Sequence, residues 1–219
     1  MKHDQDSEQA EDGFSGNRRA EARATRLYRP ALVELEGFAG FCLIRNLSLH
    51  GMMGQVYTNL TPEKAIVVHF NSENSARGTI AWSNDEQVGI YFVEEIDVDE
   101  IIHELGGKSK GNQVNRPPRL PINCTGEITV DGRIFSVDVE DISQRGAKVV
   151  GTILRPGDEI VIQLDGLETH KAVVRWSRFD TAGLNFIRPL ALDELAKWAI
   201  WKQSFGDMRD AGEAEQVRA

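Results

Sequence analysis

The stretch NLSLHG at residues 46–51 decides the fold, because it recurs as DISQRG at residues 141–146, an offset of 95 residues. Two longer stretches match at an offset of 94: LTPEKAIVVHF (60–70) with LRPGDEIVIQL (154–164), and GTIAWSNDEQVGIYF (78–92) with AVVRWSRFDTAGLNF (172–186). Several matched elements in one order, at nearly constant spacing, indicate an internal duplication. We predict that the chain consists of two copies of one domain.

Each copy contains short segments typical of β-strands, rich in β-branched or aromatic residues and separated by clusters of Gly, Pro, Asn and Asp. They are PALVEL, GFCLIRNLS, AIVVHF, GTIAWS and VGIYF in the first copy, and EITV, IFSVDVEDI, EIVIQL, KAVVRWS and AGLNF in the second. A sheet that closes into a barrel has no unpaired edges, which suits a domain of about 90 residues. We therefore predict a mainly β protein built from two small antiparallel β-barrels in tandem.

A helical pattern follows the last predicted strand of each copy. DVDEIIHELGG, from Asp97, has acidic residues in its first turn and glycines at its end, as helix termini favour. LALDELAKWAIWKQSF, from Leu190, carries apolar residues at helical spacing, and Trp198 and Trp201 share one face of it. We expect this face to pack on its own barrel, with a homodimer contact as the alternative.

Polar segments set the predicted domain boundaries. We expect disorder in the acidic residues 1–16 and in the tail 207–219, and a flexible linker at 107–114. These boundaries place the two barrel domains at 17–106 and 115–206.

The composition of the 219 residues argues against several classes of protein. The formal net charge of -9 disfavours binding along nucleic acid, which needs a broad basic face. Neither a membrane-spanning stretch nor a signal peptide is recognisable, so we expect a cytoplasmic protein. Cys42 and Cys124 lack a CxxC pattern and a nearby histidine, and we interpret both as buried thiols. His50 has no second ligand at a suitable spacing, so neither a metal nor another cofactor is expected.

Arginines precede the first predicted strand of each copy, and a [D/N]xSxxG turn follows the second strand. Arg19 and Arg23 form RxxxR in the first copy, and Arg116 and Arg119 form RxxR in the second. This combination, on a small barrel with a C-terminal helix, resembles the PilZ domain, and the resemblance covers nearly all of residues 17–205. The resemblance implies six strands in each barrel and binding of the bacterial second messenger cyclic di-GMP.

The chemistry of these residue types agrees with that ligand. Cyclic di-GMP is a dianion with two guanines, and the arginine fork donates two hydrogen bonds to the O6 and N7 edge of guanine or to phosphate. A carboxylate or amide at the first position of the turn can accept hydrogen bonds from guanine N1 and N2, and the serine hydroxyl adds a small partner. We expect the glycine to permit a positive φ and a close approach of the ligand.

The resemblance assigns ligand-binding residues position by position. In the first copy they are Arg19, Arg23, Asn46, Ser48 and Gly51, with Arg18 as an additional donor. In the second copy they are Arg116, Arg119, Asp141, Ser143 and Gly146. The second arm departs from the family pattern, because Asn115 aligns with Arg19 and two prolines stiffen the segment between the arginines. The second copy therefore either binds ligand or is a scaffold that keeps its turn for folding.

Aromatic residues at matched positions invite a stacking role, but we interpret them as barrel core. They are Trp82 and Trp176, and Phe92 and Phe186. Arg26 and Arg29 fall outside the motif, and we expect them to be solvated.

Three classes of function are compatible with this sequence. The leading one is an effector, not an enzyme, in which ligand captures the arginine arm and reorients the barrels or exposes a surface to a protein partner. The resemblance implies motility, adhesion or exopolysaccharide control. The alternative is a constitutive adaptor that does not bind nucleotide. For the third class, an enzyme or nucleic-acid binder, we find no nucleophile and base pair, no P-loop and no aromatic stacking row. A composite site between the copies stays open.

Overall fold

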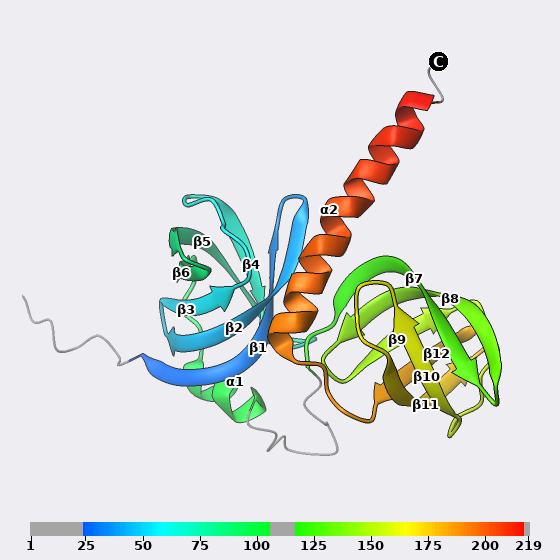
Figure 1. The fold of residues 1–219 in the computed structure, drawn as a ribbon. Coiled ribbons are helices and arrows are strands. Elements are labelled where there is room, and N and C mark those ends of the chain that lie inside the picture. Colours follow the sequence, from blue (N-terminus) through cyan, green and yellow to red (C-terminus); the bar gives the residue numbers. More distant parts are fainter. Residues whose placement is uncertain (1–23, 106–116, 217–219) are drawn as a thin grey trace, which may run out of the picture.

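The computed structural model describes residues 24–105 and 117–216, and within them two closed six-stranded barrels stand in tandem, each followed by a helix (Figure 1). The first barrel contains β1 (Thr25–Leu35), β2 (Phe38–Ser48), β3 (Gly51–Val56), β4 (Ala65–His69), β5 (Ser75–Asn84) and β6 (Gln87–Phe92), followed by α1 (Val98–Leu105). The second contains β7 (Leu120–Val130), β8 (Arg133–Ser143), β9 (Gly146–Val150), β10 (Glu159–Leu164), β11 (His170–Arg178) and β12 (Thr181–Phe186), followed by α2 (Leu192–Gln216). The predicted fold class is confirmed.

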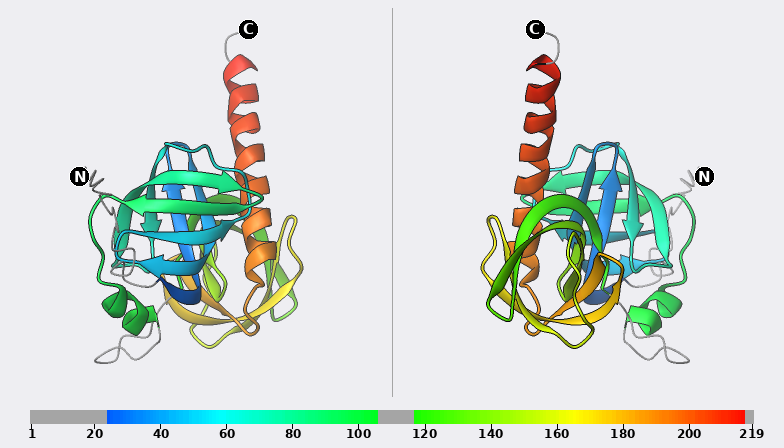
Figure 2. Two further views of the ribbon diagram at one scale, coloured as in Figure 1. Left: turned by 90° about the vertical axis from the view of Figure 1, so that its left-hand side faces the viewer. Right: turned by 90° about the vertical axis from the view of Figure 1, so that its right-hand side faces the viewer.

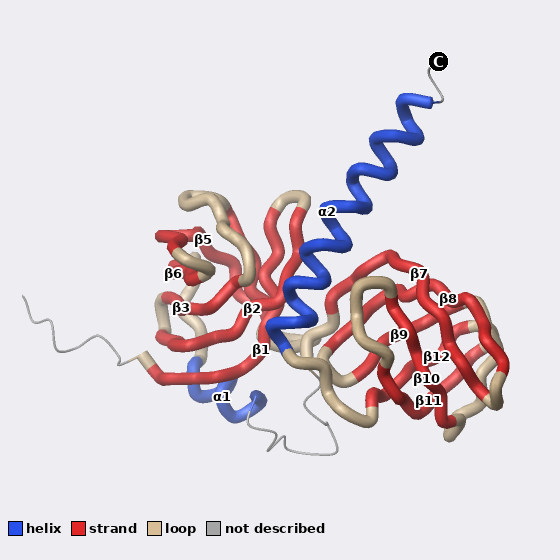
Figure 3. The backbone as a smooth tube through the Cα atoms, viewed as in Figure 1, coloured by secondary structure: helices blue, strands red, loops and turns tan. Residues whose placement is uncertain are grey.

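Both barrels have the same strand order, as a duplicated domain requires. In the first barrel the hydrogen-bonded order is β1-β2-β3-β6-β5-β4, and β4 closes the barrel by pairing with β1. The second barrel repeats this order and closes through β10 and β7. Strands dominate both units, as Figure 3 shows. The sequence patterns missed β3 and β9, because GMMGQV and GAKVV are short and begin with glycine, a weak strand former.

Inward-facing side chains fill each barrel. In β1, Ala31 and Val33 are buried in the core of the first barrel. Phe186 is buried in the second core, and Phe92 packs on the edge of the first core, with its ring centroid 6.2 Å from that of Phe70 in an edge-to-face arrangement. The prediction that Phe92 and Phe186 contribute to the cores is confirmed.

The two cysteines are free thiols with different surroundings. Cys42 lies on β2 opposite Ala31 and is fully buried, which raises the pKa of its thiol to about 12. Cys124 on β7 is only half-buried, so the prediction of full burial is wrong for this residue. Its partial burial still raises the thiol pKa to about 11, and both thiols are therefore protonated at neutral pH.

Trp82 and Trp176 lie on the outer face of the barrels, so the prediction that they are core residues is wrong. The pairing register shifts between Ile80 and Trp82 in β5, and between Val174 and Trp176 in β11. Such a β-bulge places two successive residues on the same side, whereas strict alternation from the buried Ile80 would turn Trp82 inward. The two tryptophans are accordingly 42% and 44% exposed.

Helix α2 packs against both barrels. Trp198 is buried in the second core, and its indole Nε1–H donates a hydrogen bond of 2.8 Å to a carbonyl in the β10–β11 connection. Gln203, further along the helix, donates from Nε2 to the carbonyl of Ala39 at 2.9 Å and accepts from the Ala39 N–H at 3.4 Å. Leu32 and Phe41, paired across β1 and β2, belong to the apolar cluster of the second barrel. The predicted packing of the helix on its own barrel is confirmed, and the helix joins the first barrel as well.

Beyond these contacts α2 projects past both barrels (Figure 2). It continues to Gln216, past the boundary predicted at residue 206. Within the described ranges, neither helix combines the length and the apolar character that crossing a bilayer requires.

Candidate functional site

A pocket of about 550 Å³ surrounds the β2–β3 turn of the first barrel. Its lining includes Asn46, Ser48 and Gly51 from the predicted site, and also Ala24, His50, Trp82 and Tyr91. The structure therefore brings together the three barrel residues predicted for the first copy. It also adds two aromatic side chains that the sequence patterns did not assign to a site.

Asn46 lines this pocket from β2. It lies opposite Arg26 on β1 and Met53 on β3, next to a register shift in β2. Among the described residues its side-chain amide has no hydrogen-bond partner, so the amide oxygen can accept from a ligand. Arg26 and Arg29 are exposed, as predicted. The position of Arg26 opposite Asn46 nevertheless adds a cation that the motif does not include.

The serine and the glycine of the turn have structural roles. The Ser48 hydroxyl donates a hydrogen bond of 3.0 Å to the Gly51 carbonyl, which closes the turn. Gly51 does not have a positive φ, so that expectation is wrong. A Cβ at Gly51 would instead lie 2.3 Å from the carbonyl oxygen of Ile90, and glycine is therefore needed for the close approach of β3 to β6.

The indole of Trp82 lies flat over a glycine of the neighbouring strand. A Cβ on Gly89 would be 2.2 Å from the Trp82 Nε1, so only glycine leaves room for the ring. Gly183 and Trp176 repeat this arrangement in the second barrel, at 2.1 Å. The sequence signal for it was the matched spacing of Trp and Gly in both copies. In the first barrel the exposed indole, together with Tyr91 (69% exposed), offers an aromatic surface to the pocket.

The first described residue of the chain lines this pocket. Arg18, Arg19 and Arg23 lie outside the described residues, but Ala24, the residue directly after Arg23, lines the pocket. The described chain therefore starts at the pocket that Asn46 and Trp82 line.

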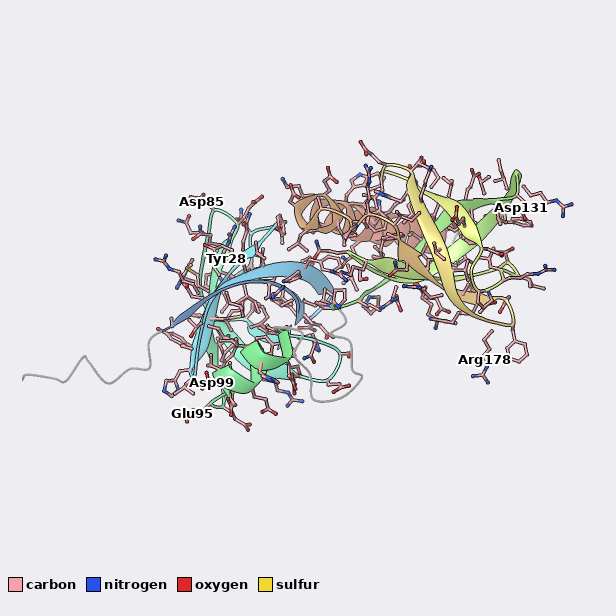
Figure 4. The ribbon with its side chains drawn as sticks, turned by 90° about the horizontal axis from the view of Figure 1, so that it is seen from below. Tyr28, Asp85, Glu95, Asp99, Asp131 and Arg178 are labelled. Carbon is pink, nitrogen blue, oxygen red and sulfur yellow. The ribbon has the colours of Figure 1, made fainter. Side chains whose placement is uncertain are left out.

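The surroundings of the pocket are acidic. A neighbouring hollow of about 570 Å³ is lined by Glu95, Asp97 and Asp99, and it shares Ser48 with the pocket. The carboxylates Glu95 and Asp99 lie on the underside of the first barrel in Figure 4. Repulsion from these carboxylates would disfavour a dianion in the pocket unless cations accompany it. Binding of an anionic ligand here therefore depends on arginines.

The turn of the second barrel is already paired within the protein. Arg119 Nη1 lies 2.5 Å from Asp141 Oδ1, and the two side chains are 40% and 24% exposed. Ser143 is 1% exposed, with its hydroxyl bonded to the Gly146 carbonyl at 3.2 Å. A Cβ at Gly146 would lie 2.0 Å from a β12 carbonyl oxygen, and Gly146 has no positive φ either. Arg116 lies outside the described residues.

The second turn is also hydrogen-bonded to the segment that leads into α2. The Leu190 N–H donates to the Gln144 carbonyl at 2.8 Å, and the Gln144 Nε2 donates to the Leu190 carbonyl at 3.0 Å. The first barrel has one equivalent backbone bond, from the Ile96 N–H to the Leu49 carbonyl at 3.0 Å. The second turn therefore connects to a helix that reaches the first barrel, whereas α1 contributes Ile101 and Leu105 to the core of its own barrel.

Comparison with protein families gives one family that spans both barrels. The family described as PilZ domain matches residues 17–106 and 113–198. The chain belongs to the PilZ domain family and carries two copies of the domain. Comparison with curated protein sequences gives no match.

Solved structures with a similar fold share little sequence with this chain. The chain is 12% identical to the Borreliella burgdorferi PlzA protein in complex with c-di-GMP, over 78% of this chain and 86% of that one, with a TM-score of 0.36. It is 16% identical to the Bacillus subtilis inhibitor of motility MotI/DgrA, over 82% and 98% of the chains, with a TM-score of 0.33. The K. pneumonia MrkH complex with c-di-GMP gives 11% identity, 84% and 90% coverage, and a TM-score of 0.34.

Proposed function

We propose that the protein is a cyclic di-GMP effector and that the pocket of the first barrel receives the ligand. The observation that carries the proposal is the convergence of three features in one pocket. Among the described residues the Asn46 amide has no partner, Trp82 and Tyr91 present exposed rings, and Ala24, which follows Arg23 in the sequence, lines the pocket. Membership of the PilZ domain family supports the same ligand.

Each group in the pocket has a distinct task in this proposal. Arg19 and Arg23, with Arg18 beside them, donate to guanine O6 and N7 or to the phosphates and neutralise the dianion. The Asn46 amide oxygen accepts from guanine N1 and N2, and the indole of Trp82 stacks on a base. Ser48 and Gly51 hold the turn rather than the ligand, because their contacts are made within the barrel.

For the second barrel we propose the scaffold role. Its first-position carboxylate is occupied by Arg119, and its serine hydroxyl is buried and bonded within the turn. A ligand would have to break the Arg119–Asp141 pair before either group could bind it. The rigid RPPR segment favours the paired state, because Pro118 is buried against the barrel and Arg119 follows it directly.

The output that we propose is a change in what the first barrel presents to a protein partner. Ordering the arm over the pocket covers Trp82 and Tyr91 and replaces an acidic, aromatic surface by a cationic segment. Such a device suits a receptor in the cytoplasm, regulating motility, adhesion or exopolysaccharide production, and it needs no catalytic step.

Calorimetric titration of cyclic di-GMP into the full chain tests this function. We expect Arg19→Ala/Arg23→Ala to weaken binding by at least about 100-fold, because two charge-assisted contacts are lost. The matched variant Arg116→Ala/Arg119→Ala should bind within about threefold of the unsubstituted protein, a difference of less than about 1 kcal/mol. Absence of heat with the unsubstituted protein, and of competition by guanine nucleotides, would favour the constitutive adaptor instead.

A further inference from the structure

The end of the second barrel that points away from the first carries an exposed apolar cluster. It consists of Ile134, near the start of β8, Ile153 in the β9–β10 connection and Phe179 in the β11–β12 hairpin, and they are 66%, 83% and 83% exposed. Figure 4 shows Asp131, in the β7–β8 connection, and Arg178, the last residue of β11, at this far end. We call these three residues the end cluster.

Backbone contacts hold the connections of the end cluster together. The Gly151 N–H donates a hydrogen bond of 3.0 Å to the carbonyl of Asp180, the residue after Phe179. A Cβ at Gly151 would lie 3.5 Å from the carbonyl oxygen of Ser136, two residues after Ile134. Because Ile153 follows Gly151 by two residues, all three apolar side chains come from backbone grouped around Gly151. Their exposure is therefore a property of one surface rather than of scattered residues.

Phe179 adopts a backbone conformation that costs free energy. Its φ is 56°, in the left-handed region where a bulky side chain is an outlier. Its ring contacts the guanidinium of Arg178, with 5.7 Å from Cζ to the ring centroid, yet the residue stays almost fully exposed. Nothing in the described part of the chain therefore buries this ring. A two-residue hairpin loop requires such a φ at its first position, so the turn places an exposed aromatic side chain here.

The first barrel shows that the fold does not require an apolar surface here. Its corresponding hairpin turn carries Asp85 and Glu86 at positive φ, where the second barrel has Phe179 at the first of these positions. At the offset of 94, Ile153 corresponds to Asn59, which is exposed and polar. Phe179 and Ile153 are thus specific to the second copy, whereas Ile134 corresponds to Ala39, which packs against the second core.

The charges beside Phe179 are self-complementary. Arg178 and Asp180 flank it, and neither forms an ion pair with another described residue. Across a twofold axis, Arg178 of one copy would face Asp180 of the other and the reverse, while the apolar side chains meet at the centre. Two chains of net charge -9 repel each other. A contact between copies is therefore most favourable where opposite charges can pair, as Arg178 and Asp180 beside Phe179 allow.

We propose that the end cluster is a self-association surface that joins two copies of this chain through an isologous contact. Of the helix face that the sequence offered as a dimer contact, Trp198 is buried within the chain, and Trp201 is 39% exposed. This proposal does not depend on ligand binding, because the end cluster and the pocket lie on different barrels. The dimer presents both pockets to solvent.

Sedimentation of the full chain over a range of concentrations tests the proposal. We expect a monomer–dimer equilibrium for the unsubstituted protein below about 100 µM and at least about tenfold weaker association for Phe179→Asp. Val93→Asp is the matched control, because Val93 is 73% exposed on the first barrel, and it should leave association unchanged. A chain that stays monomeric to about 200 µM would overturn the proposal, as would equal loss in both variants.

Two further variants separate association from folding. Phe179→Gly relieves the positive φ, so we expect it to raise the melting temperature while it abolishes the dimer. Arg178→Asp and Asp180→Arg should each weaken the dimer, because each places like charges opposite one another. The combined variant should restore it across the twofold axis. A combined variant that associates no better than the single ones would contradict the isologous arrangement.

Discussion

The two turns differ in what their first side chain does. Among the described residues, which begin after Arg23, the Asn46 side chain has no hydrogen-bond partner and lines a pocket, whereas Asp141 in the second barrel is paired with Arg119. The second turn has the aspartate of the [D/N]xSxxG pattern and an arginine at the aligned position, yet in the structure these two satisfy each other. The comparison teaches that motif residues can be retained for contacts within the barrel, whereas an exposed indole is common to both copies, at Trp82 and Trp176.

The largest effect is expected where the two barrels meet. Phe41→Ala removes a ring buried at the contact between β2 and the second core, and we expect a loss of about 3 to 5 kcal/mol in unfolding free energy. Because the contact joins the barrels, thermal unfolding should change from one transition to two. Calorimetry measures both quantities. A single transition with an unchanged midpoint would show that the barrels are not coupled through Phe41.

The turn glycines should behave alike in both barrels. Gly51→Ala places a Cβ 2.3 Å from a backbone oxygen, and Gly146→Ala places one at 2.0 Å. We expect each substitution to lower the unfolding free energy by about 1 to 3 kcal/mol. Denaturant unfolding gives the values. Gly132→Ala measures the effect of a positive φ without a steric clash, because nothing lies within 4 Å of the added Cβ. If Gly51→Ala lost ligand binding without losing stability, Gly51 would be a ligand-binding residue and its assignment to the turn alone would be wrong.

The first side chain of each turn should differ in its effect on the ligand. Asn46→Ala removes an acceptor from the pocket, and we expect about tenfold weaker binding of cyclic di-GMP, or about 1.4 kcal/mol. Asp141→Ala should leave the affinity unchanged. Calorimetric titration of the two variants side by side provides the comparison, and a larger loss for Asp141→Ala would reverse the assignment of the two barrels.

The smallest effect is expected at the ion pair of the second turn. Arg119 and Asp141 are both partly exposed, so Arg119→Ala should lower the unfolding free energy by less than about 1 kcal/mol. Repeating the denaturant titration in high salt should shrink the difference further, because salt screens exposed pairs. A loss that persists in salt would mean that Arg119 acts through packing beside Pro118 instead.

The sequence predicted the duplication, the two barrels and the helices, because these depend on periodicity and on repeated spacing. It placed Trp82 in the core, because a β-bulge after Ile80 is invisible to strict alternation. The sequence could not show that Leu32 and Phe41 lie between the barrels, because an apolar pattern does not indicate which of two cores a side chain packs against. The contribution of Ser48 and Gly51 to the turn itself also became clear only from the atoms that they contact.

Tryptophan provides the most direct test of the central claim that the first barrel, and not the second, receives the ligand. The protein has 4 tryptophans, so its indole N–H signals can be resolved by NMR and assigned with Trp82→Phe and Trp176→Phe. On addition of cyclic di-GMP we predict that the Trp82 indole signal shifts and that the Trp176 signal does not. A shift of Trp176 with an unmoved Trp82 would contradict the account.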